Sequence, residues 1–397
     1  MDLWSQLPLD LLNQITNLLN LPDLIKLSCV CSPWRSISPS TQHRGHLPWL
    51  LLPSQNNSPN SGNIWPNSLY FYSILDKTYY ELDLPEIKDR RICGSSNGWL
   101  ITIHENADIY LLHPLSRKVI MLPSLNDVPG VYGIGYSNDD GLQYIVSDSV
   151  GRRRSNASFW NSSVARDEYI VKVIVCVNLN VVLGILGELG RLLVCRVQGN
   201  EKRWIVVEDD VDAMYMDVSF YKGEFYAVDS SGAVVVVDCD ELRTRKVIDG
   251  HGYGYQSYLV ESSGDLLKVI RFLSSFGEES DDSEAEDGEP RQLNKTIRFE
   301  VWKIDFEQGL WLEVKNLGDR ALFLGINHSS SVCSSDFPGC KGNCIYFTDD
   351  CRIMHTGDYD KGICNLENGR IEAIYPDDDS KMILPRPVWY SPIQGQS

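Results

Sequence analysis

The hydrophobic pattern of the chain changes its period near Trp49, and this change most limits what the chain can fold into. Before it, apolar residues recur about every 3.6 positions, as they do on one face of a helix. Beyond it, about twenty short runs rich in Val, Ile, Tyr and Phe follow one another, separated by turn residues. No long amphipathic helix is visible among these runs. The sequence therefore predicts a small helical module followed by a large all-β domain.

A loose repeat in the β-domain narrows its architecture. A glycine, an aromatic or apolar strand, a polar turn and a second strand follow one another at 98–112 and again at 223–238, and the first half recurs at 342–349. Radial repetition of small sheets allows a β-propeller to close without exposed edges. We therefore expect a mainly β fold with a propeller of about five or six blades. The spacing of the repeat is irregular, and a pair of β-sandwiches is the alternative.

Residues 4–36 carry the helical period. Pro8 suits the first turn of a helix, where its missing N–H costs nothing, and Asp10 lies near the positive end of the same helix dipole. A break at 20–23 separates this helix from a second, and Pro33 ends or kinks the second before a short third one. Three short helices bury too little surface to be stable alone. The module is therefore expected to need a partner.

The apolar residues of these helices occur in a characteristic order. They are Trp4, Leu7-Pro8, Leu11-Leu12, Ile15, Leu18, Asp23-Leu24, Leu27, Val30-Cys31 and Trp34-Arg35. This order resembles the F-box, the module that docks on Skp1 in cullin ubiquitin ligases. The resemblance assigns nine residues to Skp1 binding, namely Leu7, Pro8, Leu11, Ile15, Leu24, Leu27, Val30, Cys31 and Trp34. Apolar and Trp anchors with little flanking charge suit such an interface. The plainer alternative is that these side chains only pack the three helices together.

Short motifs near both ends of the β-domain carry a second resemblance. They read PWLLLP at 48–53, GSSNGWL at 94–100, LHPLS at 112–116, IMLP at 120–123, ALFLG at 321–325, GNCIYFTD at 342–349 and WYSP at 389–392. They resemble the plant F-box proteins of the DUF295 family, although the usual Asn-Pro-Leu reads His113-Pro114-Leu115 here. The resemblance implies a kelch-like propeller that recruits a protein for ubiquitylation.

Three segments follow from these patterns: an F-box at 1–40, a short linker at 41–47 and the propeller domain at 48–397. The propeller domain contains an acidic insertion at about 275–293, in which 278–289 holds eight acids and no base. Such a run repels itself and buries nothing, so we expect a disordered surface loop. A regulatory or phosphorylated segment, through Ser280 and Ser283, is the alternative reading.

Charge and cysteine content exclude several classes of partner and compartment. The chain has 36 Lys and Arg against 54 Asp and Glu, a net charge of −18, which disfavours a broad surface for nucleic acid. No run of about eighteen apolar residues predicts a membrane span. Eleven cysteines, an odd number, and a start that is unlike a secretory signal indicate the cytoplasm or the nucleus.

The sequence predicts no catalytic, cofactor or metal site. Cys333, Cys340, Cys344 and Cys351 cluster, with His328 and His355 nearby, but only Cys340 and Cys344 have the spacing of a zinc pair. No nucleophile elbow, Walker loop or dinucleotide fingerprint is present. The two resemblances imply a non-catalytic substrate-recognition subunit of a Skp1–cullin–F-box E3 ligase, with a Skp1-like protein, a cullin and an unknown target protein as partners. The alternatives are an interaction scaffold outside any ligase and, more remotely, an enzyme with acids or histidines converging at the propeller centre.

Overall fold

The structure is a computed structural model that describes most of the β-domain and part of the N-terminal module. The described residues are 6–16, 19, 23, 27, 30–35, 47–52, 68–137, 141–146, 158–161, 165, 168–199, 202–209, 213–274, 295–350, 360–374 and 386–392. The predicted linker at 41–47 and the acidic insertion at 275–293 lie almost wholly outside them.

Two helices are described in the N-terminal module. Helix α1 (Leu9–Thr16) follows Pro8, whose carbonyl accepts the N–H of Leu12 at 3.1 Å, so the proline precedes the first full turn. Helix α3 (Ser32–Arg35) is a single turn with Pro33 near its start. The predicted middle helix falls largely on residues outside the described ones, so the expectation of three helices stays a prediction.

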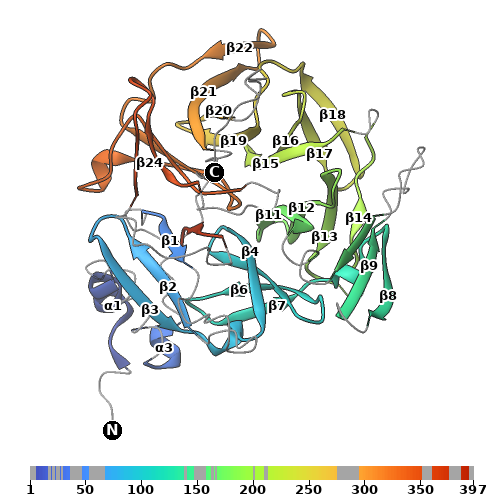
Figure 1. The fold of residues 1–397 in the computed structure, drawn as a ribbon. Helices are drawn as coiled ribbons and strands as arrows, with labels where there is room; N and C mark the ends of the chain where they lie inside the picture. The colour runs from blue at the N-terminus through green and yellow to red at the C-terminus, as the bar shows by residue number, and fades with distance from the viewer. Residues whose placement is uncertain are drawn as a thin grey trace, which may run out of the picture.

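The described β-strands form a six-bladed propeller with one additional sheet (Figure 1). Blade 1 consists of β1 (Trp49–Leu52), β2 (Ser68–Ser73), β3 (Thr78–Asp83) and β28 (Val388–Tyr390), and blade 2 of β4 (Arg90–Ser96), β5 (Trp99–His104), β6 (Ile109–His113) and β7 (Lys118–Met121). Blade 3 consists of β11 (Ile170–Cys176), β12 (Val181–Leu186), β13 (Arg191–Arg196) and β14 (Ile205–Val206), and blade 4 of β15 (Tyr215–Tyr221), β16 (Glu224–Asp229), β17 (Val234–Asp238) and β18 (Arg243–Ile248). Blade 5 consists of β19 (Gln256–Ser262), β20 (Asp265–Leu273), β21 (Thr296–Asp305) and β22 (Leu310–Glu313). Blade 6 consists of β23 (Arg320–Leu324), β24 (Ser330–Cys333), β25 (Cys344–Phe347), β26 (Gly362–Asn365) and β27 (Ile371–Glu372).

The additional sheet, β8 (Val131–Ser137), β9 (Gly141–Val146) and β10 (Ser158–Asn161), lies outside the ring beside blade 3. The prediction of a mainly β propeller with five or six blades is thus confirmed, with six. The ring excludes the pair of β-sandwiches.

The ring closes between the two ends of the chain. Strand β28 pairs antiparallel with β1, so that Trp49 faces Tyr390 and Leu51 faces Val388. Trp389, between them, is 1% exposed and packs edge-on against Phe323 of blade 6, with ring centroids 5.0 Å apart. Closure in this way removes the free inner edge that blade 1 would otherwise present.

Each interface between neighbouring blades holds its own apolar cluster. Six such clusters are formed by buried side chains from blades 1 and 2, 2 and 3, 3 and 4, 4 and 5, 5 and 6, and 6 and 1. A blade is therefore buried on both faces, which explains strands such as β12, where every residue is buried. Among the described residues, the hydrophobic core of the propeller therefore lies between neighbouring blades.

The turn between the first and second strands explains the loose sequence repeat. Asn97-Gly98 in blade 2 and Lys222-Gly223 in blade 4 both have positive φ at the two turn positions, as tight hairpins with type I′ turns require. The third copy, at 342–349, differs, because it leads into β25, which pairs parallel with β23. The repeat therefore marks equivalent hairpins in blades 2 and 4 but not in blade 6.

Candidate functional site

Helix α1 presents apolar side chains to solvent. Leu12 and Thr16 are 2% exposed, whereas Leu9 is 64%, Leu11 43% and Ile15 37% exposed. Leucine and isoleucine side chains on a short helix lose hydrophobic stabilisation when they stay in water. The helix therefore has one face packed within the chain and another that the described residues leave open to solvent.

The residues predicted to bind Skp1 divide by exposure. Pro8, Leu11, Ile15 and Val30 are exposed, and Val30 is 62% exposed. Leu7, Leu27, Cys31 and Trp34 are half-buried, and Leu24 lies outside the described residues. The sequence reasoning missed Leu9, the most exposed apolar side chain of α1, because it interrupts the periodic stripe.

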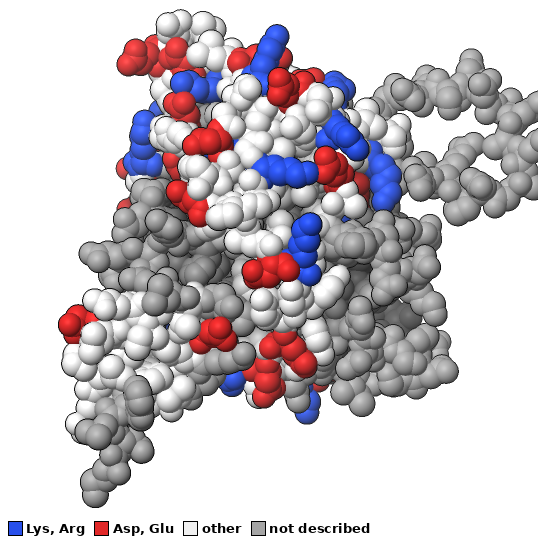
Figure 2. Space-filling model, turned by 90° about the vertical axis from the view of Figure 1, so that its left-hand side faces the viewer, with Lys and Arg blue, Asp and Glu red and all other residues white. Residues whose placement is uncertain are grey.

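The N-terminal helices lie beside the outer strands of blade 1 (Figure 1). The pKa of Tyr80 on β3 is raised by burial, by the Asp76 carboxylate, which accepts its hydroxyl at 3.3 Å, and by the Asp23 carboxylate. Asp23 belongs to the N-terminal module, so the module approaches blade 1 closely there. Figure 2 shows few charged side chains in the white area at the lower left of the molecule, whereas both signs are interspersed above it.

A buried ion pair joins the inner strands of blades 3 and 4. Lys172 Nζ lies 2.9 Å from Asp217 Oδ1, and the two side chains are 3% and 0% exposed. The ammonium also donates to the carbonyl of Gly325 at 3.0 Å. Asp217 accepts the N–H of Leu259 at 2.9 Å and the hydroxyl of Ser329 at 3.2 Å. This pair, which we call the hub, therefore links blades 3, 4 and 5 to the segment that joins β23 and β24.

A second buried network joins blades 5 and 6. Arg271 donates to Asp350 at 2.9 Å and to Asp360 at 2.8 Å, and also to the hydroxyl of Tyr258 at 3.2 Å. Asp360 accepts the N–H of Thr296 at 2.7 Å. The Arg271 side chain is 2% exposed, Asp350 7% and Asp360 11%. Because these charges are paired and hydrogen-bonded to one another, the network resembles an inter-blade link rather than an acid–base site.

Three cysteines of the predicted cluster, Cys333, Cys340 and Cys344, lie close to one another in blade 6. Burial raises the pKa of Cys340 to about 11, which disfavours the thiolate that a metal ligand requires. Cys344 lies on β25, 1% exposed, and Cys351 and His355 lie outside the described residues. Within the described ranges, no group of three or more His, Cys, Asp or Glu side chains is placed to hold a metal ion. No helix in the same ranges is long and apolar enough to cross a membrane.

Two family models match the chain. The KIB1-4 beta-propeller model matches residues 71–367, and the F-box domain model matches residues 4–42. Among curated relatives, the F-box protein SKIP23 of Arabidopsis thaliana is 29% identical over 97% of this chain and 95% of its own length. The F-box protein At2g26160 of the same plant is 24% identical over 88% of this chain and 96% of its own length.

Proposed function

Because the chain belongs to the KIB1-4 β-propeller family and carries an N-terminal F-box domain, we propose that it is a substrate-recognition subunit of a Skp1–cullin–F-box E3 ubiquitin ligase. F-box proteins serve in general as adaptors in such ligases. In this proposal the F-box binds a Skp1-like protein and the propeller binds a protein target. The proposed location is the cytoplasm or the nucleus.

The observation that carries the proposal is the exposed apolar face of the N-terminal module. Leu9, Leu11, Ile15 and Val30 are between 37% and 64% exposed although they are large and apolar. Anchors of this kind, desolvated by a partner, supply most of the free energy of a typical interface. The described residues of the module include only three charged ones, Asp10, Asp23 and Arg35, which suits the centre of an interface.

The mechanism is one of position. The F-box holds the chain on the ligase, and a target bound to the propeller is kept near the ubiquitin-charged enzyme. Tethering of this kind raises the local concentration of a target lysine without a chemical group from this chain. The buried charges of the propeller then serve its stability.

Capture of a purified plant Skp1 tests the docking half of the proposal. The double variant Leu11→Ala/Ile15→Ala removes two exposed anchors, each worth about 1–2 kcal/mol when buried by a partner, so capture should fall about 30-fold or more. Gln14→Ala, an exposed polar change on the same helix, should leave capture unchanged. The thermal midpoint should stay constant in both variants, since the anchors are not part of the core.

Equal capture by the double variant and the wild type would refute the assignment of these anchors. A failure of the wild type to capture Skp1 or to co-purify with a cullin would favour the interaction scaffold that acts outside a ligase.

A further inference from the structure

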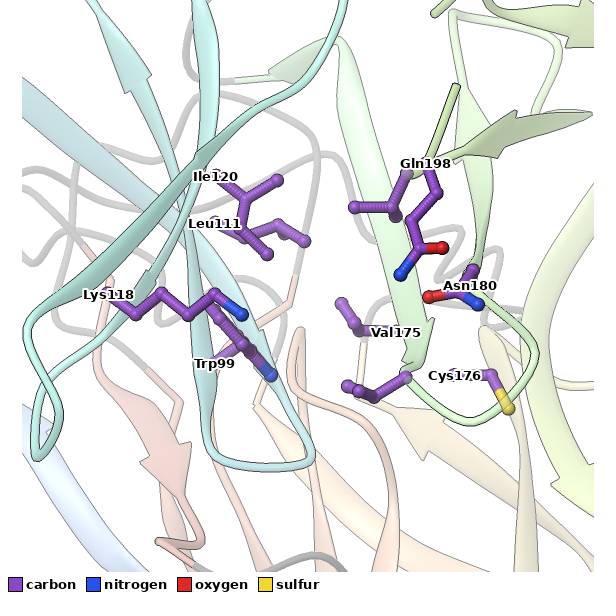
Figure 3. Close-up of a pocket in the computed structure, with 10 residues that line it drawn as sticks. Trp99, Leu111, Lys118, Ile120, Val175, Cys176, Asn180 and Gln198 are labelled. Carbon is purple, nitrogen blue, oxygen red and sulfur yellow. The ribbon is translucent and has the colours of Figure 1, made fainter. Parts of the chain in front are cut away.

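A cavity of about 250 Å³ lies between blades 2 and 3 (Figure 3). Blade 2 contributes residues of β5, β6 and β7, and blade 3 contributes the end of β11 and the turns that follow β11 and β13. The walls are largely apolar, with Trp99 and Ile120 on one side and Val175 on the other. The cavity opens at the end of the blades where the β4–β5, β6–β7 and β11–β12 turns lie.

Hydrogen bonds between the two blades fix the width of this cavity. Asn97 Nδ2 donates to the carbonyl of Val175 at 2.9 Å, and the N–H of Val175 donates to Ser96 Oγ at 3.0 Å. Both Asn97 and Ser96 belong to the β4–β5 hairpin that also positions Trp99. The cavity is therefore formed by the fold before any ligand arrives, which lowers the cost of binding.

Two hydrogen-bond donors in the cavity have no acceptor among the described residues. Trp99 is 6% exposed, and its indole N–H donates to no acceptor among the described residues. Lys118 Nζ lies 6.0 Å from the Trp99 ring centroid and belongs to none of the ion pairs between described residues. Figure 3 shows both nitrogen atoms on the side of blade 2 that faces Val175. Both nitrogen atoms are accessible to solvent, so a ligand that carries an acceptor can bond to them in place of water.

Charge points to the kind of acceptor. No residue that lines the cavity is acidic, although the chain as a whole carries a net charge of −18. Lys118 is the only formal charge in the lining. An ammonium and an indole N–H next to apolar walls complement a carboxylate that is attached to an apolar group.

Size points to a side chain rather than a whole small molecule. Small-molecule sites usually have volumes of about 300–1,000 Å³, and this cavity is smaller. A protein segment would place one large side chain inside and leave its backbone at the rim. The amide groups of Asn180 and Gln198 lie at the rim opposite Lys118, where they can hydrogen-bond such a backbone.

We propose that this cavity recognises an extended segment of the target protein in which a large apolar residue lies next to an Asp or Glu. The apolar side chain fills the space beside Trp99, Ile120 and Val175, and the carboxylate accepts from Lys118 and the Trp99 indole. The proposal rests on the function proposed above and adds to it the chemistry of the target and the face of the propeller that binds it.

Selection from a displayed library of random peptides of about twelve residues, on the purified full-length chain, tests this assignment. We expect enriched peptides to carry a large apolar residue within about two positions of Asp or Glu. An enriched peptide, made by synthesis, should bind two variants about tenfold or more weakly than it binds the wild type. These are Lys118→Glu, which reverses the charge, and Ile120→Trp, which fills the cavity.

Matched controls separate the cavity from general effects. Lys88→Glu makes the same charge change at an exposed site of the same chain, and Met121→Trp makes the same size change at a 49% exposed neighbour on β7. Both should keep wild-type affinity. Replacing the peptide carboxylate with its amide should weaken binding to the wild type and have little effect on Lys118→Glu.

Two results would overturn the inference: enrichment without the apolar–acidic pair, or a winner that binds all four variants equally. Lys118 is exposed, so its variant folds even where Ile120→Trp does not. Skp1 capture by the same variants should equal that of the wild type. Loss of peptide selection with intact Skp1 capture would refute the cavity alone, and absent Skp1 capture with intact selection would refute the ligase role alone.

Discussion

Replacing Lys172 with methionine should destabilise the propeller strongly, and a second change at Asp217 should restore part of the loss. In the wild type, Asp217 is 0% exposed and its charge is balanced by Lys172 Nζ at 2.9 Å. Lys172→Met leaves that carboxylate buried without its cation. The carbonyl of Gly325 also loses the ammonium that donates to it at 3.0 Å.

The expected loss follows from the cost of breaking a buried pair. Removing one partner typically costs about 3–5 kcal/mol, because the other charge stays buried alone. A domain of about 350 residues has an unfolding entropy of about 0.7 kcal/mol/K, so the thermal midpoint should fall by about 4–7 °C. In Lys172→Met/Asp217→Asn both charges are gone, and the amide oxygen still accepts from the N–H of Leu259. The double variant should therefore lose only about 1–3 kcal/mol, less than the single one.

The pH dependence gives an independent signature. Burial raises the pKa of Asp217, and Lys172 opposes the rise. Without Lys172 the folded-state pKa rises further above its unfolded value, so protonation favours the folded state of the variant more than that of the wild type. The stability deficit of Lys172→Met should thus shrink as the pH falls.

Thermal unfolding followed by circular dichroism, at about pH 7.5 and about pH 5.5, measures both effects. A single variant whose midpoint lies within about 1 °C of the wild type would refute the reasoning. So would a double variant that is less stable than the single one, because the loss would then not come from an uncompensated charge.

Two further predictions concern a half-buried histidine and a turn glycine. Burial, with a smaller contribution from Lys172, lowers the pKa of His328 to about 4, below its unfolded value of about 6.5. The stability contributed by the neutral His328 is present above pH 6.5 and is lost as the pH falls towards 4, by up to about 3 kcal/mol. His328→Gln should therefore weaken the pH dependence of the unfolding free energy, measured by urea denaturation, between pH 6.5 and pH 4. The same pH dependence in the variant and the wild type would contradict this. Gly98→Ala and Gly223→Ala both place a side chain at positive φ, +81° and +87°, but only at Gly98 would the new Cβ lie 3.1 Å from the Pro392 carbonyl. Each variant should lose about 1 kcal/mol from the backbone and Gly98→Ala about 1 kcal/mol more, and equal thermal midpoints would show that the contact does not matter.

Local pattern predicted much of the fold because many strands are short runs of β-branched and aromatic residues bounded by turn residues. The repeats predicted at 98–112 and 223–238 coincide with the strand pairs β5–β6 and β16–β17. By contrast, β12 carries no periodic signal, since it is buried on both faces and its sequence VVLGIL does not alternate. The pairing of β28 with β1 could not be predicted from the sequence for a different reason. Residues about 340 positions apart leave no local signature of their contact.

The candidate sites also divide into features that local sequence predicts and features that depend on contacts between distant residues. The order of apolar residues predicted the F-box, which a family model matches at residues 4–42, but periodicity could not separate buried Leu12 from exposed Leu11. A leucine that packs in the core and a leucine that binds a partner are equally hydrophobic, so hydrophobicity alone does not tell them apart. The cavity between blades 2 and 3 gave no sequence signal, because Trp99 and Val175 meet only once both blades are in place.

The packing of the blades also connects the two proposed binding functions. Val175, which lines the cavity, lies on the same strand as Lys172 of the hub, and its backbone is hydrogen-bonded to the β4–β5 hairpin of blade 2. Blade 2 in turn shares an apolar cluster with blade 1, and blade 1 is approached by Asp23 of the N-terminal module. The path from the F-box to the cavity therefore runs through packed sheets. A ligase adaptor that works by position gains from such a path, since a fixed separation keeps the effective concentration of the target high where a loose tether would lower it.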